Sequence, residues 1–75
     1  MAREQFDRNS AWLQAHISEI YPLHRGKHIC IAGQEVFSAD RIEDAIRAAT
    51  AAHPEDAGWF TRFIPAVKAI RIYAT

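Results

Sequence analysis

The chain of 75 residues has a single cysteine, Cys30, and this scarcity excludes two common ways of stabilising a small domain. One cysteine cannot form a disulfide within the chain, and it cannot supply a zinc site built from several thiolates. Such sparing use of cysteine is typical of reducing compartments. We therefore expect a cytoplasmic protein.

The sequence also lacks an excess of charge of either sign and any long apolar run. Nine Lys and Arg residues balance nine Asp and Glu residues, which gives a formal net charge of zero. Without a net positive field to attract phosphates, the composition argues against nucleic acid as a partner. No apolar run approaches the roughly 18 residues of a membrane span, and residues 1–7 are too polar for the apolar core of a signal peptide. The sequence thus predicts no membrane partner.

What the chain does contain is apolar residues, which make up 49% of it. This content is typical of folded globular proteins. A domain of this length buries only about 60% of the surface that its unfolded chain exposes, so its core is marginal. We expect one small domain that is stabilised by self-association, as a homodimer.

The first half of the chain predicts a helix followed by a hairpin. After a flexible lead-in over residues 1–9, apolar residues recur at helical spacing over residues 10–21, and Pro22 ends this helix. The stripe consists of Trp12, Leu13, His16, Ile17, Ile20 and Tyr21. Two strands follow, over residues 27–32 and 35–38, and Gly33-Gln34 between them fits a type II′ turn.

The second half predicts a helix and one or two further strands. Asp40 and Glu43 form a capping-box pair ahead of an alanine-rich helix over residues 41–52, with Ile42 on its buried face. Residues 59–64 are aromatic and β-branched, as strands prefer. Residues 69–73 alternate as a fourth strand, joined to the third by a hairpin loop over residues 65–68, or form a tail that pairs with a sheet edge.

These elements predict an α+β domain in which an N-terminal helix precedes a β-β-α-β(-β) core over residues 26–65, with residues 66–75 as a strand or tail. Both faces of the hairpin carry apolar side chains, so we expect it to be covered on both sides. We assign the face of Ile29 and Ile31 to the helix over residues 41–52. The opposite face, with His28 and Cys30, is assigned to the N-terminal helix or to a second copy of the chain.

The stretch Arg25-Gly26-Lys27-His28-Ile29-Cys30-Ile31, with the following turn and the helix led by Asp40, resembles a small prokaryotic domain family of unknown function. The first strand of that family reads approximately Tyr-x-Gly-Lys-Trp-Val-Ala-Ile. The likeness spans residues 12–65: Gly26 and Lys27 match directly, and Ile31, Val36, Asp40 and Ile46 match in character. His24, His28 and Cys30 stand where the family has Tyr, Trp and Ala. The resemblance implies a β-β-α-β core and supplies no activity, cofactor or catalytic residue.

Those three departures include the best candidates for chemistry. His24, His28 and Cys30 are of the residue types that bind zinc or copper, and His28 and Cys30 share one face of their strand. A fourth ligand is lacking unless His16 or His53 supplies it. The competing interpretation is that Cys30 is a small core residue, which the incomplete ligand set favours. A Cys30 nucleophile activated by a neighbouring His is a further, weaker hypothesis.

For function, the sequence favours a non-enzymatic protein-interaction or oligomerisation module without a cofactor. The alternatives are a metal- or small-ligand-binding protein that uses His24, His28 and Cys30, and a regulatory, antitoxin-like partner protein. The interface candidates are aromatic or apolar residues of the strands, in which an excess over what the helices cover would leave an exposed patch. They are His28, Cys30, Trp59, Phe60, Ile70, Ile72 and Tyr73.

Overall fold

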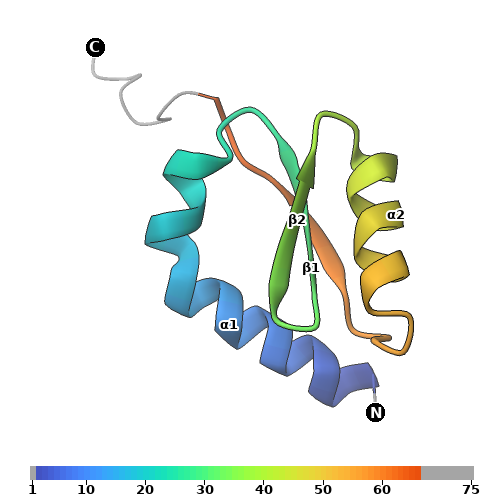
Figure 1. Ribbon diagram of the computed structural model, residues 1–75. Coiled ribbons are helices and arrows are strands. Elements are labelled where there is room, and N and C mark those ends of the chain that lie inside the picture. The colour runs from blue at the N-terminus through green and yellow to red at the C-terminus, as the bar shows by residue number, and fades with distance from the viewer. Residues whose placement is uncertain (1, 67–75) are drawn as a thin grey trace.

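The structure, a computed structural model, describes residues 2–66. These form helix α1 (Ala2–Leu23), strands β1 (His28–Ala32) and β2 (Glu35–Ala39), helix α2 (Ile42–Ala52) and strand β3 (Phe60–Phe63) (Figure 1). The strands make an antiparallel sheet in the order β2-β1-β3, so that β1 is central. The predicted α+β fold is confirmed, whereas the predicted fourth strand over residues 69–73 lies outside the described residues.

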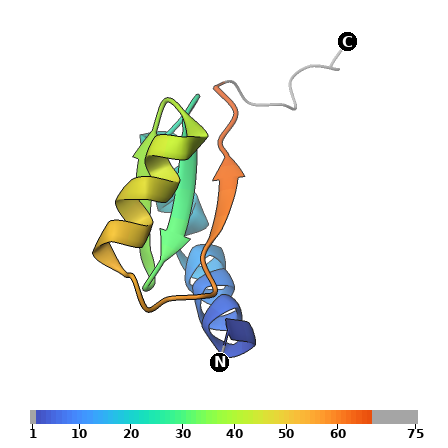
Figure 2. The same ribbon diagram turned by 90° about the vertical axis from the view of Figure 1, so that its right-hand side faces the viewer.

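The two helices cover opposite faces of the sheet, but in the reverse of the predicted assignment (Figures 1 and 2). Ile29 and Ile31 are fully buried against α1, together with Leu13 and Ile20. Cys30 belongs instead to the cluster on the α2 side. The physical reason is size. The small residues Ala45 and Ala49 of α2 fit closely over Cys30 and Ala32, whereas the larger isoleucines of β1 need the bulkier stripe of α1.

Helix α1 is longer than the sequence predicts, since it includes residues 2–9 of the supposed lead-in and continues through Pro22. Tertiary contacts explain the early start. The ring of Phe6 packs edge-on against Phe60, with centroids 5.3 Å apart, and Asn9 is buried. Pro22 lies in the last turn, where its missing N–H costs the helix a single hydrogen bond.

The hairpin turn is of the type I′ class and not type II′, because Gly33 and Gln34 both have φ of +58°. This turn matches the right-handed twist of the flanking strands. Gln34 adopts the left-handed conformation although it is not a glycine. Hydrogen bonds from the backbone N–H groups of both turn residues to side chains elsewhere in the chain hold it there.

The predicted capping box of α2 is wrong. The N-cap residue is Arg41, which makes no side-chain cap bond, because Asp40 is engaged elsewhere. Its carboxylate accepts a hydrogen bond of 2.7 Å from the Lys27 ammonium. That bond and the charge of Lys27 lower the pKa of Asp40. Ile42, predicted to be buried, is 36% exposed.

Between residues 2 and 66, neither helix combines the length and the apolar composition that crossing a membrane requires.

Candidate functional site

The three candidate metal ligands do not form a site. Cys30 is fully buried under α2, and the ring of His28 packs against Phe63 with centroids 4.9 Å apart. His24 follows the end of α1, and its backbone N–H bonds to the carbonyl oxygen of Ile20. Within residues 2–66, no group of three His, Cys, Asp or Glu side chains is placed to hold a metal ion.

The two other histidines are also engaged. Nδ1 of His16 lies 2.8 Å from the carbonyl oxygen of Trp12, and the two rings stack. Nε2 of His53 lies 2.6 Å from the carboxylate of Glu35. Within the described part of the chain, neither ring joins the other candidate ligands in a group placed to hold a metal ion.

The environment of Cys30 also argues against its use as a nucleophile. Burial raises the pKa of the Cys30 thiol to about 11, and the negative charge of Asp56 acts in the same direction. A reactive cysteine needs the opposite conditions, namely exposure and a neighbouring positive charge. Cys30 is thus a small core residue, in agreement with the competing interpretation from the sequence.

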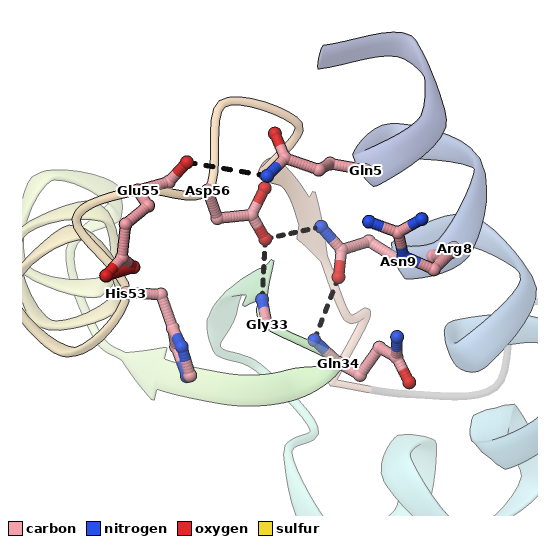
Figure 3. Close-up of a pocket in the computed structure, with 8 residues that line it drawn as sticks. All are labelled: Gln5, Arg8, Asn9, Gly33, Gln34, His53, Glu55 and Asp56. Atoms are coloured by element: carbon pink, nitrogen blue, oxygen red, sulfur yellow. Dashed lines mark hydrogen bonds between the residues drawn. The ribbon is translucent and has the colours of Figure 1, made fainter. Parts of the chain in front are cut away.

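A polar hollow of about 230 Å³ lies where the N-terminal half of α1, the β1–β2 turn and the loop after α2 meet (Figure 3). Eight residues line it, and all come from these three segments. They are Gln5, Arg8, Asn9, Gly33, Gln34, His53, Glu55 and Asp56. No local pattern in the sequence indicates this site, because the three segments lie far apart in the chain.

Asn9 and Asp56 form the floor of the hollow and bond to each other at 2.9 Å (Figure 3). The Asn9 amide also donates to the carbonyl oxygen of Gly58, and its oxygen accepts from the N–H of Gln34. The Asp56 carboxylate accepts from the N–H groups of Gly33 and Gly58 as well. We call this set of bonds the polar junction; it ties α1, the hairpin turn and the segment before β3 together.

The electrostatics of Asp56 fit this structural role. Burial raises the pKa of its carboxyl, but the hydrogen bonds from Asn9, Gly33 and Gly58, together with nearby His53, outweigh that effect and lower the pKa. A carboxylate whose pKa is lowered and that already accepts three hydrogen bonds is a poor general base, because it binds a proton weakly and most of its lone-pair sites are occupied. The junction therefore positions segments of the chain.

The second candidate site is an aromatic surface on both sides of β3. Phe6, Trp59 and Phe63 are 44%, 36% and 51% exposed, and they are three of the five most exposed large apolar residues between positions 2 and 66. Phe6 contacts Phe60 on the α1 side, and Phe63 contacts His28 on the other side. We call these five residues, Phe6, His28, Trp59, Phe60 and Phe63, the β3 aromatic surface.

The surface exists because α2 covers only part of the sheet. Figure 2 shows α2 in front of β1 and β2, with β3 to its side. Side chains alternate along a strand, and Phe60 packs on the α1 side. Thr61 and Phe63 therefore stand on the α2 side, where the helix does not reach them. Trp59, which directly precedes β3, is exposed as well.

The backbone of β3 is also available along its outer edge. Ile64 directs its N–H to Lys27 and its carbonyl oxygen to Gly26, on the β1 side. Because backbone groups alternate along an antiparallel strand, those of Thr61 and Phe63 point outward. Within residues 2–66 no strand pairs with this edge.

Of the predicted interface candidates, Trp59 directly precedes β3, Phe60 lies on its α1 side, and His28 contacts Phe63 on its α2 side. Cys30 is buried beneath α2. Ile70, Ile72 and Tyr73 lie outside the described residues. Phe6 was missed because it falls in the supposed lead-in. Its only signal in the sequence is that it is the single large apolar residue among polar neighbours.

Comparison with protein-family models, with curated proteins and with solved structures finds no match to this chain. The case for its function therefore rests on its own residues.

Proposed function

We propose that this protein is a non-enzymatic interaction module that self-associates as a homodimer through the β3 aromatic surface. The observation that carries the proposal is the exposure of Phe6, Trp59 and Phe63 around a single edge strand. Large apolar side chains left exposed on both faces of one edge strand can be covered by a partner that binds along that edge. Aromatic side chains supply a large share of binding energy at such surfaces.

Two further features support a second copy as the partner. The net charge of zero removes the long-range repulsion that keeps charged proteins apart. A chain of 75 residues has a small core. Covering apolar surface by association therefore adds a larger share of its total stability than it would in a larger domain. The resemblance to a family of unknown function adds no activity to this proposal.

The non-enzymatic part of the proposal draws on the state of the reactive groups. Cys30 is buried with a raised pKa, and the carboxylate of Asp56 is occupied by three hydrogen bonds. Neither group offers the accessible nucleophile or free base that catalysis needs.

The test is sedimentation equilibrium or light scattering over a concentration series from about 1 to 500 µM. We expect a dimer mass that dissociates on dilution, and a melting temperature that rises with concentration. Phe63→Glu should give a folded monomer. The matched control is Ile42→Glu, which places the same charge at an exposed apolar position on α2 and should leave the dimer intact.

Two results would contradict the proposal. A wild-type protein that stays monomeric over the whole series rules out self-association. Equal loss of the dimer in both variants rules out the β3 aromatic surface as the interface, because Ile42 lies outside it.

A further inference from the structure

We propose that the partner of the outer edge of β3 is the segment of residues 69–73 from a second copy, so that each protomer donates one strand and accepts one. This inference rests on the proposed function, since it names the element through which the two copies associate. It makes the interface an extension of both sheets.

The acceptor side of this pairing lies in the described residues. The outward N–H and C=O groups of Thr61 and Phe63 have no strand partner within residues 2–66. Aromatic side chains flank this edge on both faces, with Phe6 on one side and Phe63 on the other. An edge strand of this kind binds an added strand by main-chain hydrogen bonds, and the flanking side chains select alternate residues of it.

The donor is a stretch beyond residue 66 that has a strand pattern. Nine residues follow Ala66, and Ile70-Arg71-Ile72-Tyr73 within them alternates apolar and polar or aromatic side chains. Such alternation is what a strand needs when its two faces meet different surroundings. Isoleucine and tyrosine are also among the residues that strands prefer.

The course of the chain after β3 disfavours pairing of this segment with its own strand. The backbone bonds of Ile64 to Lys27 and Gly26 hold it against the start of β1. A Cβ placed on Gly26 would lie 3.5 Å from the Ala66 methyl, so the chain still follows this connector at Ala66. Ala66 therefore does not contribute to the chain reversal that the predicted loop over residues 65–68 requires.

A return to the same strand then leaves Val67 and Lys68 to reverse the chain before Ala69. Two-residue hairpin loops require positive φ at one or both positions, which favours Gly, Asn or Asp and opposes a β-branched residue such as Val67. A second copy removes this restriction, because the segment then reaches the edge of β3 without a tight turn. A reciprocal exchange between two copies also forms a closed two-fold dimer.

The test uses the full chain in a dimer mixed from two differently labelled preparations. One is labelled with ¹⁵N and ²H, and the other is unlabelled apart from ¹³C-methyl groups in isoleucine. We expect isotope-filtered NOEs from the Thr61 and Phe63 amides to the methyl groups of Ile70 or Ile72 of the other copy.

A pair of variants supplies the second measurement. Ile72→Pro removes a backbone donor from the proposed strand and should weaken the dimer at least about tenfold. Thr75→Pro, beyond the proposed strand, should leave it unchanged. Both variants should keep the helical far-UV circular dichroism signal of the wild type, because neither substitution lies in α1 or α2.

The outcomes separate this inference from the proposed function. Absence of NOEs from the Thr61 and Phe63 amides to the isoleucine methyl groups of the other copy in a mixed dimer would overturn the inference. An unchanged dimer in Ile72→Pro would overturn it as well, while in either case self-association through the β3 aromatic surface stands. A protein that is monomeric throughout the concentration series contradicts both.

Discussion

Asn9 offers the sharpest test of the polar junction. Its side chain is 1% exposed, and its amide group makes three hydrogen bonds, to Asp56, Gly58 and Gln34. Asn9→Ala removes all three without changing the helical backbone, since alanine is a better helix former than asparagine. Any loss of stability then reports on the bonds themselves.

The expected loss follows from the partners. The bond to the ionised carboxylate of Asp56 contributes about 1.5 to 3 kcal/mol, and the two bonds to backbone groups contribute about 1 kcal/mol each. Water can reach Asp56 through the open hollow and replace part of this, so we expect a loss of about 3 kcal/mol. The whole domain has about 4 to 11 kcal/mol of stability.

The measurement is urea unfolding at one fixed protein concentration, followed by tryptophan fluorescence. With a slope of about 1 kcal/mol/M for a domain of this size, the midpoint should fall by about 3 M. Gln14→Ala, an exposed position on the same helix, is the matched control and should change the midpoint little. If the two variants unfold within about 0.5 kcal/mol of each other, the junction does not stabilise the fold and this reasoning is refuted.

Three further predictions concern single features. Gln34→Gly should stabilise the protein by about 0.5 kcal/mol in the same urea assay, because glycine adopts the φ of +58° without steric cost; a loss of stability would contradict this. Cys30 should react with a thiol reagent at least about a thousandfold more slowly in the native protein than in denaturant, since reaction needs opening of the core; rapid native labelling would refute its burial. The lowered pKa of Asp56 stabilises the fold above the ordinary value of 3.8, and this contribution is lost as the pH falls through the folded pKa. Acid unfolding should therefore be less steep in Asp56→Asn, and an unchanged profile would count against the hydrogen-bonded carboxylate.

The sequence predicted the elements of the fold well because its local signals are strong. The alternation around Ile29 and Ile31, the glycine turn and the alanine-rich helix each carry their own pattern, and all three elements are present. Which helix covers which face could not be predicted in this way. Both faces of β1 are apolar, and the choice depends on the fit of Ala45 and Ala49 against Cys30, which only the packed structure contains.

The sites were harder to predict, because they join residues that are distant in the chain. The Asn9–Asp56 bond spans 47 positions, and each of its partners is an ordinary polar residue by itself. The His24, His28 and Cys30 group attracted attention through residue type alone. Burial of Cys30 beneath α2 then removed it from the accessible surface, a fact that residue types do not encode.

The polar junction and the β3 aromatic surface are physically coupled through Gly58. A Cβ at this position would clash with the backbone nitrogen of Phe6, so the start of α1 rests directly on the segment that leads into β3. Asn9 and Asp56 bond to the carbonyl oxygen and the N–H of the same glycine. The junction therefore fixes the positions of Phe6 and of Trp59, the residue after Gly58. Because the bonds that stabilise the fold also align the aromatic side chains, pairing of two copies at this surface should stabilise the junction in return.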